Sequence, residues 1–337
     1  MPFLQYLHAV AERRNLGTAD AFDAMEAILA GEVSAAQIAA FLTALRMKGE
    51  TVDELVGFAR AMRKRAVRLD VGLNGEALLD TCGTGGDGQS TFNISTIAAF
   101  VAAGAGVRVA KHGNRSASSQ CGSADLLESL GILVSLPPKM VARAIREVGI
   151  GFLFAPLVHT AMKHAQPVRV ELKMRTVFNL LGPLTNPAGA TAQLVGAPSE
   201  HAAELMAGAL AQLGLERGFV VHGSDGLDEI TTTGLTLAYE IGGGRVEGRE
   251  LSPEDFGVER AGASELKGAD PETNAVIARA IFQGAVGPQR DIVLVNASAA
   301  LVAAGRAWDF REGMELARRS IDSGAAWKKV EDLARFG

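Results

Sequence analysis

A glycine-rich segment at residues 80–96 carries the clearest chemical signal in the sequence. It reads Asp-Thr-Cys-Gly-Thr-Gly-Gly-Asp-Gly-Gln-Ser-Thr-Phe-Asn-Ile-Ser-Thr. Its four glycines remove side chains, so that backbone N–H groups can converge on an anion. Hydroxyl and amide side chains follow where a helix is expected to begin, and a helix N-terminus also attracts anions. These side chains are Ser90, Thr91, Asn93, Ser95 and Thr96. The segment predicts a phosphate site rather than a plain glycine-rich turn.

Two common nucleotide-binding motifs are absent from this segment. It lacks the Gly-Lys-Ser/Thr ending of a P-loop and the Gly-x-Gly-x-x-Gly pattern of a dinucleotide fold. Asp87 is unusual in a phosphate loop. We expect its carboxylate to contact a sugar hydroxyl, or a metal ion through water.

A second polar segment begins at Lys111, directly after a predicted strand at 107–110. Lys111 would suit a pyrophosphate as a point charge, and Ser118, Ser119 and Ser123 can donate to its oxygens. A solvated basic turn is the alternative. The neighbouring His112 would be structural if it stood alone.

Adjacent acids occur in a third segment, where Asp228 and Glu229 end the run Gly-Ser-Asp-Gly-Leu-Asp-Glu. Carboxylates are the ligands that Mg²⁺ prefers, usually together with water and substrate phosphate. Two acids in a loop are often only a solvated turn, but two neighbouring phosphate loops favour a metal site. The sequence does not predict zinc, because its cysteine and histidine side chains lack ligand spacing.

Helical patterns dominate the first seventy residues. One apolar-periodic stretch runs from Thr18 to Gly31. Capping boxes at Ser34 with Gln37, and at Thr51 with Glu54, open two more. We predict a small α-helical domain without strands at 1–70.

Alternating strand and helix patterns follow the basic stretch at 63–65 and indicate an α/β domain with a mostly parallel sheet flanked by helices. Strands are expected at 77–82, 107–110, 151–154 and 218–221, helices at 97–103, 123–130 and 138–148, and a hairpin at Gly242-Gly243-Gly244. Ligands of such sheets bind beyond the carboxyl ends of strands, where the polar segments lie.

One helical stretch does not suit the sheet. Residues 161–181 are interrupted by Pro167 and are too polar to cover a sheet, so we expect them to return to the first domain. The predicted division is therefore 1–70, joined in space by about 161–185, and an α/β domain made of 71–160 and 186–337.

Composition narrows the class of protein. The chain has 337 residues, 48% of them hydrophobic, with 39 glycines and only two cysteines, which excludes disordered, collagen-like and disulfide-scaffold proteins. No signal peptide or membrane span is recognised, so a cytoplasmic location without membrane contact is expected. A net charge of -5 argues against non-specific nucleic-acid binding.

Five motifs, in order along nearly the whole chain, closely resemble the anthranilate phosphoribosyltransferases of tryptophan biosynthesis. They are Gly83-Thr-Gly-Gly-Asp87, Asn93-Ile-Ser-Thr96, Lys111-His-Gly-Asn-Arg115, Gly122-Ser-Ala-Asp125 and Phe178-Asn-Leu-Leu-Gly-Pro-Leu-Thr-Asn-Pro187. The resemblance implies a homodimer, and a small helical domain packed against a larger α/β domain with the active site between them. It also places 161–181 in the helical domain.

The resemblance also implies roles for individual residues. Phosphoribosyl pyrophosphate (PRPP) would be bound by Gly83, Gly86, Asp87, Thr91, Asn93, Ile94, Ser95, Thr96, Lys111, His112, Gly113, Asn114, Arg115, Ser118, Ser119 and Ser123. Anthranilate would contact Gly83 and Asn114, and its carboxylate would face Arg169. Mg²⁺, the implied cofactor, would be held by Ser95, Asp228 and Glu229.

Three positions depart from the family pattern. Thr160 stands where proline is usual, Lys173 where glycine is common and Cys121 where serine is frequent. None is an implied ligand, so they bear on the local loop geometry around the anthranilate path.

The expected reaction is displacement of pyrophosphate from C1 of the ribose by the amino group of anthranilate. An arylamine is neutral and nucleophilic at pH 7, so the difficult step is departure of the leaving group from an oxocarbenium-like carbon. We expect Lys111, Asp228 and Glu229, the last two through Mg²⁺, to stabilise its growing charge.

Two other functions stay open at this point. A pyrimidine nucleoside phosphorylase shares the two-domain plan, but would show a different glycine spacing. A nucleic-acid-binding relative without transferase activity should have a basic surface and need not keep Asp228 and Glu229. The net charge and the retained acids disfavour it.

Overall fold

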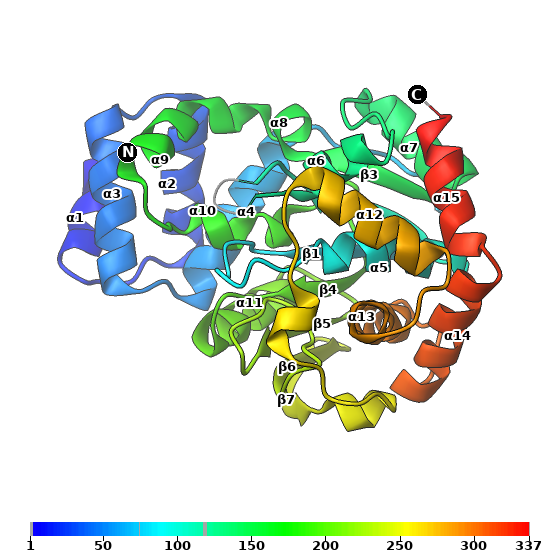
Figure 1. Ribbon diagram of the computed structural model, residues 1–337. Coiled ribbons are helices and arrows are strands. Elements are labelled where there is room, and N and C mark those ends of the chain that lie inside the picture. The colour runs from blue at the N-terminus through cyan, green and yellow to red at the C-terminus, as the bar shows by residue number, and fades with distance from the viewer. Residues whose placement is uncertain (1–2, 74, 117–119, 337) are drawn as a thin grey trace.

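The computed structural model describes residues 3–73, 75–116 and 120–336 (Figure 1). Four helices form an N-terminal bundle, drawn in blue at the left of Figure 1. Both predicted capping boxes are present, and Gly31 ends the first predicted helix in the left-handed conformation, with φ 78°. The bundle helices are α1 Leu4–Ala11, α2 Thr18–Ala30, α3 Ala35–Lys48 and α4 Val52–Arg65.

A seven-stranded sheet forms the centre of the larger part, in the order β3-β2-β1-β4-β5-β6-β7. The first five strands of this order are parallel and the last two pairings are antiparallel, which confirms the predicted fold class. The strands are β1 Leu78–Gly83, β2 Arg108–Gly113, β3 Ile150–Phe154, β4 Ala192–Gly196, β5 Arg217–Gly223, β6 Thr236–Gly242 and β7 Arg245–Leu251. Gly243 and Gly244 turn the predicted hairpin with positive φ angles of 57° and 76°.

The strand β4 was missed by the sequence analysis, although it lies between β1 and β5 in the sheet. Gln193 interrupts its apolar pattern. The Gln193 side chain is buried, and its Nε2 donates to the Pro183 carbonyl oxygen at 2.9 Å. Because the Gln193 side chain is hydrogen-bonded, β4 can be buried although its sequence is not continuously apolar, and the apolar pattern alone did not predict the strand.

Helices cover both faces of the sheet, and alternate strand residues face each layer. On one face, Leu194 and Phe219 join a core that includes α5 (Ile94–Gly104) and α13 (Pro288–Ala303). On the other, Val195 and Val220 join a core shared with α11 (Glu200–Gln212) and the helical bundle. The remaining helices are α6 Ser123–Ser129, α7 Pro138–Glu147, α8 Ala155–Val158, α12 Pro271–Phe282, α14 Phe310–Asp322, α15 Ala325–Ala334, η3 Pro253–Phe256 and η4 Ala263–Leu266.

The segment expected to be helical at 161–181 is broken into short pieces. They are η1 Thr160–His164, α9 Gln166–Leu172, α10 Phe178–Leu181 and, directly after it, η2 Pro183–Thr185. Pro167 does not interrupt a helix but lies in the first turn of α9, where its missing N–H costs nothing. The break comes instead at Lys173, whose φ of 48° is left-handed. Glycine adopts this conformation more easily than lysine does, and glycine is common at this position in the family that the sequence resembles.

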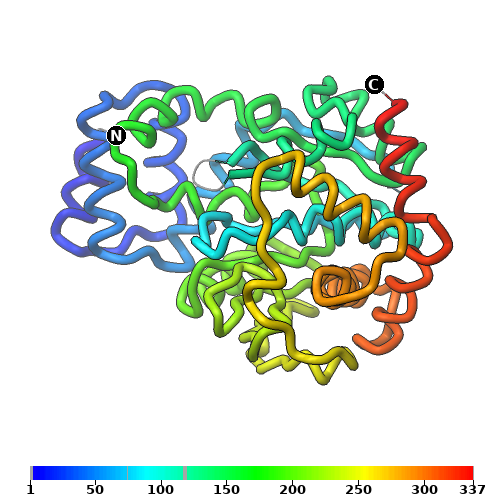
Figure 2. The backbone as a smooth tube through the Cα atoms, in the orientation of Figure 1, coloured from blue at the N-terminus to red at the C-terminus, as the bar shows by residue number. Residues whose placement is uncertain are grey.

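This segment packs against the helical bundle. Ala165 and Val168 are buried in the same core as the bundle helices, and η1 and α9 contact α2 and α3. Figure 2 shows the segment in green beside the blue helices. The exact domain boundaries remain our prediction. In the described ranges, no helix is long and apolar enough to cross a membrane.

Candidate functional site

The glycine loop and the acidic loop meet at the carboxyl ends of β1 and β4. Gly83 pairs with Gly196 in the parallel register. A Cβ atom on Gly196 would lie 1.6 Å from the Asp228 carbonyl oxygen, and one on Gly83 would lie 2.5 Å from Asp228 Oδ2. Only glycine allows so close an approach, and Gly85 N–H then donates to Asp228 Oδ2 at 2.8 Å.

Glu229 reaches the first turn of α5. The Ser95 N–H donates to Glu229 Oε1 at 3.0 Å, so the three predicted metal ligands Ser95, Asp228 and Glu229 lie together. A carboxylate at a helix N-terminus is favoured by the helix dipole. A residue that was not predicted from the sequence fixes the chain just after this acidic pair. Asn296, buried in α13, accepts from Ile230 N–H and donates to the Ile230 carbonyl, both at 2.9 Å.

Burial dominates the electrostatics of the acidic pair. It raises the pKa of Asp228 to about 7, with Asp87 adding to the effect, and that of Glu229 to about 8, with Asp228 adding to it. Two buried carboxylates side by side require either protons or a cation. Among the described residues no three His, Cys, Asp or Glu side chains converge as a metal site. Mg²⁺ would fit these two acids, because it commonly keeps water and substrate phosphate as its other ligands.

Lys111 lies beneath the glycine loop rather than open to solvent. Its side chain is buried and its Nζ donates to the Thr81 carbonyl oxygen. Burial lowers the pKa of Lys111, while Asp80 and Glu229 act to raise it. The ammonium group therefore interacts with the charges of Asp80 and Glu229 and offsets part of them.

His112 is held on both sides by the chain. Its backbone N–H donates to Asp80 Oδ1 at 3.0 Å, and its ring Nδ1 lies 3.2 Å from the Gly182 carbonyl oxygen. Its ring centroid lies 5.0 Å from that of His159, a contact that the sequence analysis missed. Burial lowers the pKa of His112 to about 4 and that of His159 to about 3, so both rings are neutral at pH 7.

The residues that follow His112 in the second polar segment contact the start of α6. Asn114 N–H donates to Ser123 Oγ at 3.2 Å, and a Cβ on Gly113 would lie 2.3 Å from the same oxygen. Arg115 instead pairs with Asp125 at 2.8 Å and Glu128 at 2.7 Å, near the surface. Ser118 and Ser119 lie outside the described residues.

The far end of the glycine loop is fastened to the chain near α12. Thr91 forms an isolated bridge with Lys267. Asn93 Nδ2 donates to the Cys121 carbonyl at 3.1 Å, and Asn93 Oδ1 accepts from Asn274 Nδ2 at 3.0 Å. The Asn93 side chain is thus engaged within the protein, and Asn274 is a second supporting residue that sequence reasoning missed. Ile94 and Thr96 follow as buried residues in the first turn of α5.

Two arginines come from the segment beside the bundle. Arg169, on α9, donates to Gln166 Oε1 at 3.2 Å, and its guanidinium carbon lies 5.3 Å from the Phe178 ring centroid. Arg175 reaches the glycine loop, where its Nη1 donates to the carbonyl oxygens of Gly85 at 2.7 Å and Gly86 at 2.9 Å. The sequence held no signal for Arg175, because its segment was expected to be helical.

A mostly parallel sheet with a helical bundle at its side, and a glycine loop facing buried acids, is the two-domain arrangement of a glycosyltransferase family. Family models agree. Residues 75–327 match the α/β domain of a glycosyl transferase family, and residues 4–66 match its helical bundle domain.

The chain belongs to the anthranilate phosphoribosyltransferase family. It is 69% identical over 336 residues to the anthranilate phosphoribosyltransferase of Solibacter usitatus, covering 100% of this chain and 99% of the relative.

Solved structures of the same family share the fold. The enzyme from Thermus thermophilus superposes with a TM-score of 0.93 at 47% identity, covering 98% of each chain. The Saccharomyces cerevisiae enzyme in complex with PRPP and Mg superposes with a TM-score of 0.91 at 30% identity, covering 99% of this chain and 97% of that one.

Proposed function

We propose that this protein transfers the phosphoribosyl group of PRPP to the amino group of anthranilate, giving N-(5-phosphoribosyl)anthranilate and pyrophosphate in tryptophan biosynthesis. The observation that carries the proposal is the meeting of the glycine loop with the acidic pair, through Gly85 with Asp228 and Ser95 with Glu229. Backbone amides for phosphate and carboxylates for a divalent cation then lie at one sheet edge. The family relationship supports the same reaction.

The substrate positions follow from the family motifs. PRPP binds along the glycine loop from Gly83 to Asp87, at Thr91, over 93–96 and along the second segment from Lys111. Ser95, Asp228 and Glu229 hold Mg²⁺ together with the pyrophosphate oxygens. Anthranilate enters beside Gly83 and Asn114 with its carboxylate facing Arg169, whose guanidinium keeps donors beyond the one spent on Gln166.

Catalysis in this site is mostly positioning and charge stabilisation. The C1–N bond forms as the C1–O bond to pyrophosphate breaks, and the proton that the arylamine nitrogen loses is released to solvent. The bound Mg²⁺ supplies positive charge to the leaving pyrophosphate. Asp228 and Glu229 hold that cation, and the Lys111 ammonium adds a second positive charge below the loop. No strong base is needed, since the amine is neutral at pH 7.

The fluorescence of anthranilate gives a direct test. Protein, PRPP and Mg²⁺ are mixed with anthranilate, and the loss of its signal is followed with and without chelator. We expect a loss that requires both PRPP and Mg²⁺. Folded protein that leaves the signal unchanged would contradict the proposal. Phosphate-dependent cleavage of a pyrimidine nucleoside, or DNA binding weakened by salt, would then identify the alternatives.

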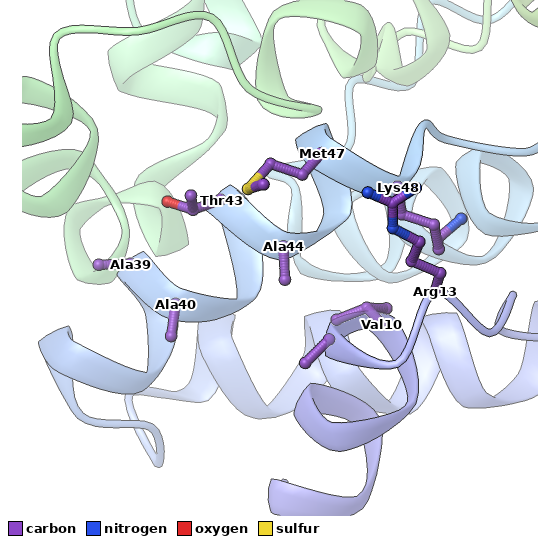
Figure 3. A pocket seen from close by; sticks show the side chains of 9 residues that line it. Val10, Arg13, Ala39, Ala40, Thr43, Ala44, Met47 and Lys48 are labelled. Atoms are coloured by element: carbon purple, nitrogen blue, oxygen red, sulfur yellow. The ribbon is translucent and has the colours of Figure 1, made fainter.

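Two copies of the chain associate as a homodimer in this proposal. A groove of about 420 Å³ lies between α1 and α3 (Figure 3). These helices are on the outer side of the bundle, away from the sheet (Figure 1). Its lining is largely apolar and includes Val10, Ala39, Ala44 and Met47, and Met47 is 70% exposed. Light scattering of wild type and Ala44→Glu tests this: a dimer that becomes a monomer in the variant supports it, and a monomeric wild type contradicts it.

A further inference from the structure

Arg175 connects the segment proposed to bind anthranilate with the loop proposed to bind PRPP. It lies between α9, which carries Arg169, and α10, and its side chain crosses to the glycine loop. Thr176 N–H donates to Asn179 Oδ1 at 3.0 Å, so the turn that carries Arg175 is itself fastened. A single guanidinium nitrogen takes two successive carbonyl oxygens, those of Gly85 and Gly86.

These two hydrogen bonds determine which way the loop amides point. In a trans peptide unit the C=O and N–H groups point in opposite directions, and the described residues include no cis peptide. Holding the Gly85 carbonyl therefore directs the Gly86 N–H away from Arg175. Holding the Gly86 carbonyl does the same for the Asp87 N–H. Gly85 and Gly86 have positive φ angles of 64° and 69°, which glycine adopts without strain.

Both amides are left open for a ligand. Within the described ranges, neither Gly86 N–H nor Asp87 N–H donates a hydrogen bond to the chain, whereas Thr84, Gly85 and Gln89 N–H all do. Gly86 is exposed, so its amide is accessible. Two successive open N–H groups form a concave anion site of the kind that binds phosphate oxygens.

We propose that Arg175 is a positioning residue that orients the Gly86 and Asp87 amides toward the phosphate oxygens of PRPP. The inference rests on the proposed function. Arg175 acts through the loop backbone, since its Nη1 is spent on the two carbonyls. Its Nη2 is buried and has no partner among the described residues, which leaves the two N–H groups of this nitrogen beside the loop.

A competing role for Arg175 is purely structural, as a tie between the bundle-side segment and the sheet. The two roles differ in what they change. A purely structural contact would change the stability of the protein, and any effect on KM would be similar for PRPP and for anthranilate. An orienting residue acts on PRPP, because the amides it directs belong to the PRPP loop, and leaves anthranilate binding at Arg169 intact.

Steady-state kinetics of R175Q and R175K separate these roles. We expect R175Q to raise KM for PRPP about tenfold, or about 1.4 kcal/mol, and to change KM for anthranilate less than threefold. R175K keeps a cation that can donate to carbonyl oxygens, but its flexible side chain lacks the fixed geometry of the planar guanidinium, so its KM for PRPP should fall between R175Q and wild type. R335Q removes the same charge from a side chain that is 73% exposed, and should match wild type.

Four results would overturn the inference. If R175Q has a KM for PRPP within twofold of wild type, the inference is wrong but the proposed function stands. The same holds if the KM values for PRPP and for anthranilate rise equally. An inactive but folded wild type overturns it together with the proposed function. If R175Q does not fold, calorimetry of R175K with pyrophosphate and Mg²⁺ decides: affinity weakened threefold or more supports the inference, and unchanged affinity overturns it.

Discussion

The carbonyl oxygen of Asp228 occupies the space where a side chain on Gly196 would begin, 1.6 Å from an ideal Cβ. The end of a central strand and the acidic loop are therefore packed backbone to backbone. The acidic pair takes its position from this approach, from the Gly85 hydrogen bond and from the hydrogen bonds of Asn296 to Ile230.

We expect Gly196→Ala to lower kcat/KM about 100-fold, because a displacement of the loop by about an ångström is costly in a positioned site. The variant should also lose Mg²⁺ affinity. Gly242→Ala, at the hairpin end of β6, meets nothing within 4 Å and serves as the control. Equal activity of the two variants would show that the loop can relax around the added methyl group.

Asp228→Asn with Glu229→Gln should abolish Mg²⁺-dependent turnover, with a loss of at least about 100-fold. The same double variant should melt at a higher temperature than wild type in metal-free buffer, since it no longer buries two ionisable acids. Activity assays across a Mg²⁺ series and thermal melting measure both effects. Unchanged turnover and unchanged metal dependence would mean that these residues do not bind the metal.

The metal-free protein should lose stability as pH rises from about 6.5 to 8. Burial raises the pKa values of Asp228 and Glu229 in the folded state to about 7 and about 8. The unfolded chain has already released these protons, so it binds fewer than the native state, and the free energy of unfolding falls. Saturating Mg²⁺ should remove the fall, and Mg²⁺ affinity should rise over the same range. Urea titrations at pH 6.5, 7.2 and 8, with Asp228→Asn/Glu229→Gln as control, measure this.

His112 and His159 act in the opposite direction and in a lower range. Burial lowers their pKa values to about 4 and about 3. The unfolded chain therefore binds more protons below about pH 6.5, and stability is lost as the solution is acidified. His159→Gln should reduce the loss between pH 6 and 4.5 in urea titrations. An identical slope in wild type and variant would show that His159 does not contribute.

Lys173→Gly should stabilise the fold by roughly 0.5–1 kcal/mol, because a non-glycine residue in the left-handed region costs about 1–2 kcal/mol and glycine returns part of that as unfolded-state entropy. The Lys173 side chain is exposed, so few contacts are lost. Lys139→Gly, inside α7, is the control and should destabilise. Equal destabilisation by both changes would contradict the conformational argument.

Local signals in the sequence predicted much of this molecule. Capping boxes and terminal glycines are local, and both predicted boxes are present. The glycine and acidic segments were predicted to share one sheet edge, and they do so in the structure. The buried position of Gln193 and the contact of Arg175 with the glycine loop were not predicted. The hydrogen-bond partners of these side chains lie elsewhere in the chain, at Pro183 and in the glycine loop. Asn274 and Asn296 support the site through pairings that local patterns do not show.

The helical bundle shares its core with Ala165, Val168 and Leu184. These residues follow the end of α4 by about 100 to 120 positions. At a synthesis rate of roughly 5–20 residues per second, the first four helices emerge from the ribosome roughly 6–24 seconds before Leu184. A nascent chain of this length therefore carries an incomplete bundle with apolar surface exposed, and pausing or truncation between residues 66 and 184 should favour capture by chaperones.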